Sequence, residues 1–172
     1  MWETYAKILG QHTANILTNI TDCGPFNVLL IDLPRGKSAR ELAVSIDFDG
    51  LLLDSRKPVS GYMICGAVHR GDIWPLLAHI ASHLGLDTSI LETETGPQDI
   101  LDEFLNIVIG LAGADWAEHG FEMNFSIPQP MSGQTLPLLQ LDDQAFHLVA
   151  SGPTGLQVDL MVVFSHQDQT AG

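Results

Sequence analysis

Apolar residues recur at three- and four-residue steps in several stretches of the chain, a spacing that is typical of amphipathic helices. We expect three helices, over residues 4–20, 72–84 and 98–118. Gly85 follows the second as a C-terminal cap, and Gly120 ends the third. The third segment is the longest helical pattern in the chain.

Other stretches carry the two-residue alternation or the short apolar runs of strands. Residues 43–48 alternate, Asp49-Gly50 is a turn signal, and residues 61–68 are apolar on both faces, as in a central strand. A Gly-Pro-containing turn at 151–155 predicts a hairpin between the last two strands. The expected strands are residues 27–32, 43–48, 51–54, 61–68, 122–127, 136–141, 145–150 and 156–164, with a frayed tail at 165–172.

This order of elements predicts a single domain over residues 1–172, because no low-complexity segment or charge block marks a boundary. The fold class is α/β (α+β), with a largely antiparallel sheet covered by long helices.

Charge narrows the range of partners. The chain has 7 Lys and Arg against 21 Asp and Glu, a formal net charge of −14, and none of the basic residues follows Arg70. Such a chain lacks the basic footprint that nucleic acids require, and anionic membrane surfaces repel it. Hydrophobic residues still make up 45% of the sequence, which is ample for a core.

The longest apolar runs, residues 27–33 and 160–164, are far shorter than the ~20 residues that span a bilayer. The first ten residues lack the basic and apolar regions of a secretory signal, so we expect a cytoplasmic protein. Cys23 and Cys65 lack CxxC spacing, and we expect both to be small buried side chains.

The 98–118 helix has two distinct faces. Glu103, Asn106 and Gly110, together with Asp99, fall opposite the apolar stripe, and Glu103 and Asn106 are neighbours at a three-residue spacing. They could reach together into a partner, or they could be ordinary solvated residues; a mid-helix glycine would allow close approach. The apolar stripe, which should pack on the sheet, consists of Leu101, Phe104, Leu105, Val108, Leu111 and Ala112.

The segment Asp102-Glu-Phe-Leu-Asn-Ile-Val-Ile-Gly110, followed by Asn124-Phe-Ser-Ile-Pro128 and Gly133, resembles the core of the CheX and CheC chemotaxis phosphatases. The shared pattern is a helical E-x-x-N with a glycine four residues on, then a strand that ends in S-x-P. CheC-type members carry a second E-x-x-N on the first helix, where this chain has His12 to Asn19 and no glutamate. One active site, as in CheX, is therefore expected.

The resemblance implies hydrolysis of the aspartyl phosphate on a CheY-like response-regulator receiver domain. Asn106 would orient the attacking water, and Glu103 would pair with the lysine of the receiver. No metal or cofactor of its own is needed, because the receiver supplies the Mg²⁺. CheX-like proteins pair through sheet edges, so residues 156–164, with few charges, suggest a homodimer edge. Nothing in the residues identifies the cognate receiver.

Two alternatives come from other functional classes. The domain could bind a receiver without turnover, as a scaffold, or it could sense a small molecule in a pocket between the 61–68 strand and the 72–84 helix. Metal sites are less favoured. His79 and His83 lie one turn apart on a helix but lack HExxH spacing. Asp47, Asp49 and Asp54 are more typical of a solvated strand face and turn.

Overall fold

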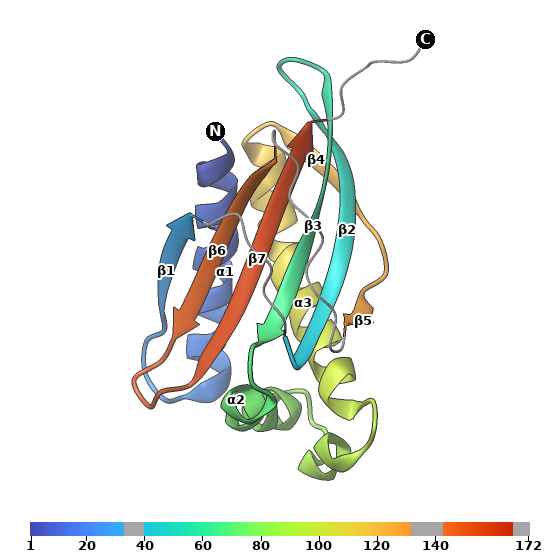
Figure 1. The fold of residues 1–172 in the computed structure, drawn as a ribbon. Helices are drawn as coiled ribbons and strands as arrows, with labels where there is room; N and C mark the ends of the chain where they lie inside the picture. The colour runs from blue at the N-terminus through green and yellow to red at the C-terminus, as the bar shows by residue number, and fades with distance from the viewer. Residues whose placement is uncertain (33–39, 132–142, 167–172) are drawn as a thin grey trace.

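The computed structural model describes residues 1–32, 40–131 and 143–166, which form one antiparallel sheet with three helices on one face (Figure 1). The helices are α1 (Trp2–Thr21), α2 (Arg70–His83) and α3 (Gly96–Glu118), with a short 3-10 turn η1 (Thr88–Glu92) before α3. The strands are β1 (Asn27–Asp32), β2 (Leu42–Leu52), β3 (Lys57–Ala67), β4 (Phe121–Phe125), β5 (Gln129–Met131), β6 (Gln144–Ser151) and β7 (Gln157–His166).

The sheet has an internal pseudo-two-fold arrangement. Its strand order is β1-β6-β7-β3-β2-β4, with β5 paired to one end of β2. Exchanging β1 with β4, β6 with β2 and β7 with β3 leaves this order unchanged. The same exchange relates the two long helices, since α1 packs on β1 and β6 while α3 packs on β4 and β2. The predicted single domain with an antiparallel sheet under long helices is confirmed.

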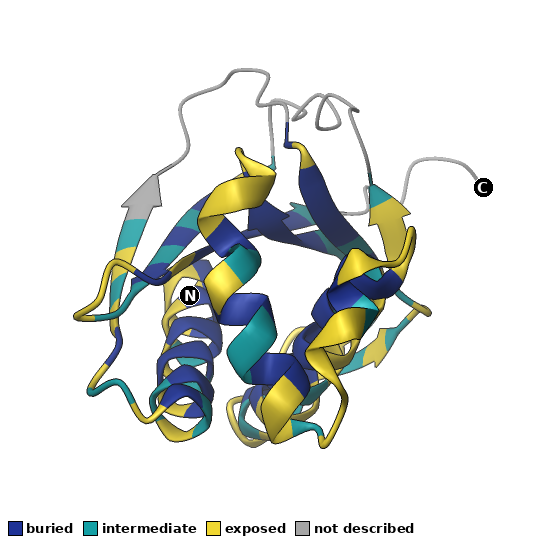
Figure 2. Cartoon of the chain, turned by 90° about the horizontal axis from the view of Figure 1, so that it is seen from below, coloured by how far each residue is buried: buried dark blue, intermediate teal, exposed yellow. Residues whose placement is uncertain are grey.

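The core lies between the sheet and the helices, whose buried sides turn toward the sheet (Figure 2). Aromatic rings fill the space where α1 and α3 meet the sheet. Trp2 stacks on Phe164 with centroids 4.7 Å apart, and Trp116 stacks on Phe121 at 5.8 Å. The ring of Tyr5 lies against all four. This cluster fixes α3 relative to α1 and to the sheet.

The opposite face of the sheet carries a smaller apolar cluster and a buried ion pair. Arg40 Nη1 donates to Asp159 Oδ2 at 3.0 Å, and both residues are less than a tenth exposed. His147 Nε2 lies 3.6 Å from the same carboxylate oxygen. The cluster consists of Ala43, Ile64, Met161 and Val163.

The turn expected at Asp49-Gly50 is wrong, because β2 runs unbroken to Leu52 and the turn follows it. Gly50 is required for another reason. A Cβ at this position would collide with the backbone carbonyl of Glu122, and it would lie 2.9 Å from the ring of Phe121. The glycine therefore lets β4 approach β2.

The expected free edge at residues 156–164 is also wrong. β7 pairs with β6 on one side and with β3 on the other, so it is an interior strand. In the described part of the chain the sheet ends in β1 and β4. The expected homodimer stays a prediction, but β7 cannot supply its edge.

The remaining differences are local. Short elements η1 and β5 were not predicted, and the expected frayed tail is wrong at Ser165 and His166, which lie in β7. The expected strand at 136–141 and the rest of the tail lie outside the described residues. The two-sided apolar pattern at 61–68 is confirmed as part of central strand β3. Within the described ranges, no helix is both long and apolar enough to cross a membrane.

Candidate functional site

Glu103 and Asn106 lie on the outward face of α3, one turn from each other, and both are exposed. Neither side chain makes a hydrogen bond or ion pair with any described residue. Gly110 lies a further turn along the same face and is exposed as well, and a Cβ there would meet no atom within 4 Å. The predicted outward face is therefore confirmed, and it offers an unoccupied carboxylate, an amide and a site of close approach.

The opposite side of α3 holds this face in place. Phe104, Leu105 and Val108 are fully buried, as predicted from the helical spacing. Leu111 departs from the prediction, because it is 47% exposed while neighbouring Ile109 is buried. The helix is turned so that position 109 faces inward, toward the edge of the sheet near β4. The display of Glu103 and Asn106 is unaffected by this rotation.

Asp102, directly beside Glu103, has an unusual environment that sequence reasoning missed. It is half-buried, and its Oδ1 atom is inaccessible and has no hydrogen-bond partner. Burial raises the pKa of this carboxyl to about 6, with help from the charges of Asp99 and Glu103. Gln98, one turn earlier, also has a buried side-chain oxygen without a partner. The clustering of three acids within five residues, Asp99, Asp102 and Glu103, was the available signal.

The second block of the family-like pattern lies next to α3. The ring of Phe125 in β4 would be 3.3 Å from a Cβ placed on Gly113 of α3. Ser126 ends the strand by pairing twice with Asp47: its backbone N donates to the Asp47 carbonyl at 2.9 Å, and its Oγ accepts from the Asp47 N at 3.0 Å. The serine thus ties the end of β4 to β2. Gly133 lies outside the described residues.

The equivalent face of α1 carries different chemistry. Gln11 Nε2 donates to Asn15 Oδ1 at 2.9 Å, so these two exposed side chains satisfy each other. The acid of this helix, Glu3, forms an ion pair with Lys7 and has no asparagine three residues later. The E-x-x-N pattern is therefore confined to one of the two pseudo-symmetric helices.

The candidate metal positions do not converge. In the portion of the chain that is described, no group of three or more His, Cys, Asp or Glu side chains could hold a metal ion. His79 instead lies 4.0 Å from the thiol of Cys23, and His83 is exposed. Asp47 and Asp49 are exposed on one face of β2, as expected of a solvated strand face.

The two cysteines differ. Cys65 is fully buried as predicted, and burial raises the pKa of its thiol to about 12. Cys23 is only half-buried, and its thiol donates to the Thr21 carbonyl at 3.1 Å.

The glycines of β3, which the small-molecule sensor alternative would set beside a pocket, are closely packed against neighbouring strands. A Cβ at Gly61 would collide with the Val163 carbonyl and the ring of Phe48. A Cβ at Gly66 would collide with the Leu42 carbonyl. These glycines therefore serve close strand packing.

No protein-family model matches this chain, and neither does any curated protein sequence. Solved structures do match its fold. A CheC-like chemotactic protein from Shewanella oneidensis superposes with a TM-score of 0.71 at 14% identity, covering 96% of this chain and 100% of the other. A CheC-like superfamily protein from another Shewanella species gives 0.69 at 16% identity, covering 94% and 97%.

A third match is the complex of CheX with CheY, BeF3 and Mg²⁺ from Borrelia burgdorferi. It superposes with a TM-score of 0.64 at 12% identity, covering 94% of this chain and 98% of the other. The chain therefore has the fold of the CheX and CheC-like chemotaxis proteins.

Proposed function

We propose that this protein hydrolyses the aspartyl phosphate of a CheY-like receiver domain, using Glu103 and Asn106. The observation that carries the proposal is the pair itself: a carboxylate and an amide, adjacent, exposed and without partners on a helix that the core holds rigidly. The fold shared with a CheX that is found in complex with CheY supports a receiver domain as the partner.

The expected chemistry requires little from this chain beyond position. In phosphoryl transfer the acceleration comes mostly from orientation and electrostatics. The receiver holds the acyl phosphate and its Mg²⁺. Asn106 would accept a hydrogen bond from the attacking water through Oδ1 and donate through Nδ2, without adding negative charge near the phosphoryl oxygens. The water would then be held in line with the bond that breaks.

Glu103 has a different role, because a carboxylate facing the phosphoryl group would repel it. One turn before Asn106, it is placed to pair with a lysine of the receiver and so set the register of α3 on the partner. A cytoplasmic location belongs to the same proposal, since receiver domains act there.

The test is the decay of phosphate on a Mg²⁺-loaded receiver domain from the same organism. Wild type should accelerate decay, and Asn106→Ala should lose about 10²–10³ of that acceleration while still binding. Asn15→Ala is the matched control, because it removes an exposed amide from the pseudo-symmetric helix. Equal rates for wild type and Asn106→Ala would exclude this mechanism. Binding without any acceleration by wild type would instead favour a non-catalytic scaffold.

A further inference from the structure

A groove lies between α3 and the β4 side of the sheet, and its lining on α3 begins at Ile109 and Gly110. It encloses about 680 Å³ between α3 and β4. Ile109, Gly110 and Gly113 form its helical wall, and Met123 and Phe125 form its strand wall. Since Gly110 lies one turn beyond Asn106, about 6 Å along the axis, any partner that covers Asn106 also reaches the mouth of this groove.

The strand wall of the groove is β4, which is an edge of the sheet formed by the described residues. The Leu53 N donates to the Gly120 carbonyl, and the Ser126 N donates to the Asp47 carbonyl, each at 2.9 Å. Backbone groups of even-numbered residues between them therefore point toward β2. Those of Met123 and Phe125 point the other way, where no described strand pairs with them. An edge of this kind can accept an added strand.

The helical wall leaves room for such a strand. A Cβ at Gly110 would meet no atom within 4 Å, whereas a Cβ at Gly113 would lie 3.3 Å from the ring of Phe125; Ala117 continues the same small-residue line along α3. Larger side chains at these positions would cover the edge of β4. The helical wall is therefore open beside Gly110, and at Gly113 it packs against the ring of Phe125.

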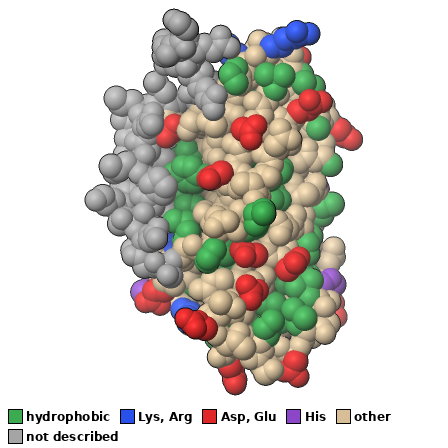
Figure 3. All heavy atoms as spheres, turned by 90° about the vertical axis from the view of Figure 1, so that its right-hand side faces the viewer, with side chains coloured by type: hydrophobic (Ala, Val, Ile, Leu, Met, Phe, Trp, Pro, Cys, Tyr) green, Lys and Arg blue, Asp and Glu red, His purple; other side chains and the backbone are tan. Residues whose placement is uncertain are grey.

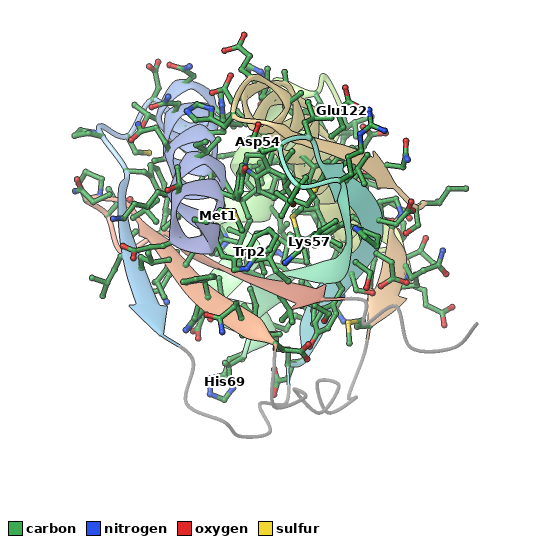
Figure 4. All side chains as sticks on the ribbon, turned by 90° about the horizontal axis from the view of Figure 1, so that it is seen from above. Met1, Trp2, Asp54, Lys57, His69 and Glu122 are labelled. Atoms are coloured by element: carbon green, nitrogen blue, oxygen red, sulfur yellow. The ribbon has the colours of Figure 1, made fainter. Side chains whose placement is uncertain are left out.

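The rim of the groove is acidic. Asp49 and Glu122 both line it, both are exposed, and neither forms an ion pair with a described residue. Glu122 lies at the outer side of the molecule beside α3 (Figure 4). Acidic side chains spread across this side of the molecule, and the few visible Lys and Arg side chains lie at its margins (Figure 3). A second copy is a poor occupant, because two such acidic rims would repel each other.

We propose that this groove binds an extended segment of the receiver domain that carries Lys or Arg, which pairs with the edge of β4 while its cations meet Asp49 and Glu122. The inference rests on the proposed function for the identity of the partner. It adds a second contact region, which sets affinity and partner choice rather than the rate of hydrolysis.

The first experiment measures binding of the receiver domain loaded with Mg²⁺ and beryllofluoride. Glu122→Lys should weaken binding about tenfold, and Glu122→Gln about threefold. Glu92→Lys is the matched control, because it makes the same change in net charge at an exposed position on η1, away from the groove. It should change binding less than twofold. Equal effects of the two lysine variants would overturn the proposal.

The second experiment measures hydrogen exchange of the backbone amides of β4. In the complex, amide exchange at Met123 and Phe125 should slow by at least tenfold relative to the free protein, since a paired strand protects these N–H groups. Unchanged exchange at both residues would also overturn the proposal.

Turnover separates this inference from the proposed function. At saturating receiver, Glu122→Lys should keep the wild-type kcat and raise KM, whereas Asn106→Ala should lose kcat. If Asn106→Ala has the same kcat as wild type while Glu122→Lys still weakens binding, the groove proposal is supported and the proposed phosphatase mechanism is excluded. If Glu122→Lys binds the receiver as tightly as wild type while Asn106→Ala is inactive, the phosphatase mechanism is supported and the groove proposal is excluded. If wild type binds no receiver, the groove proposal is overturned.

Discussion

The indole Nε1 of Trp116 donates a hydrogen bond of 2.9 Å to the backbone carbonyl oxygen of Tyr5. The phenol of Tyr5 in turn donates to the carbonyl of His119 at 2.9 Å. These two bonds join α3 to α1 at the aromatic cluster. The helix that displays Glu103 and Asn106 is therefore held by directional contacts as well as by apolar packing.

Trp116→Phe should test this anchor. The substitution removes the indole donor, while the Tyr5 carbonyl keeps its bond within α1, so the lost hydrogen bond costs about 0.5–1.5 kcal/mol before the lost packing is counted. The melting temperature should fall by roughly 2–4 °C for each kcal/mol. Trp74→Phe is the control, because Trp74 is only half-buried. The Arg70 guanidinium carbon lies 5.1 Å from the centroid of its ring, in a surface contact. A Trp116→Phe protein as stable as wild type would show that the bond contributes nothing.

Gly110→Ala should stabilise the protein more than Gly113→Ala. A methyl group at Gly110 meets no atom within 4 Å, so Gly110→Ala should gain about 0.5–1 kcal/mol from helix propensity. At Gly113 the same methyl lies 3.3 Å from the ring of Phe125, and much of the gain should be lost. Urea denaturation of both variants measures the difference. Equal gains in the two variants would mean that Phe125 and β4 shift to accommodate the added methyl group at little cost in free energy.

Asp159→Asn should destabilise the protein by about 3–5 kcal/mol, because it leaves Arg40 buried without a counter-charge. Replacing both residues, as Arg40→Met with Asp159→Leu, should recover much of the loss. Denaturant midpoints of the three proteins give the comparison. A double variant no better than Asp159→Asn would argue that the ion pair is worth more than an apolar substitute.

The same carboxylate predicts a response to acid. Burial alone would raise the pKa of Asp159, but His147 nearby and the hydrogen bond and charge of Arg40 outweigh it and hold the pKa below the ordinary 3.8. The stabilisation is therefore present above pH 3.8 and is lost as pH falls through the lower folded-state pKa. The double variant should lack this loss in acid titrations of stability.

Asp102→Asn should change the pH dependence in the opposite sense. The pKa of Asp102 is raised to about 6, so the folded state holds its proton more tightly than the unfolded state. Wild-type stability should consequently fall as pH rises from about 4 to 6, by about 1–2 kcal/mol after solvent screening is allowed for. Asp102→Asn should remove this slope. A slope that persists in the variant would assign it to another group.

Sequence patterns identified the elements well where periodicity and capping agreed. The β1 strand has the predicted bounds, and α3 begins two residues early because Pro97 fits a first helical turn. The outward placement of Glu103 and Asn106 follows from helical spacing alone, without knowledge of what the helix covers.

Long-range packing caused the errors. Asp49-Gly50 has the composition of a turn, but Gly50 is small because β4 passes close to it, which no local pattern reveals. The apolar run at 160–164 indicated a strand without saying where it lies in the sheet, although an apolar pattern on both faces favours an interior position. The raised pKa of Asp102 depends on its burial, which adjacent residues do not determine.

The pseudo-two-fold arrangement of the sheet bears on how many receiver domains one chain can bind. Two equivalent helices lie on two equivalent halves of the sheet, yet only α3 presents an unpaired carboxylate and amide, while Gln11 and Asn15 on α1 bond to each other. A receiver that docks through Glu103 and Asn106 therefore has one binding site per chain. Titration calorimetry should saturate at one receiver per chain. The contribution of α1 is then structural, because it packs against α3 and holds that helix in place.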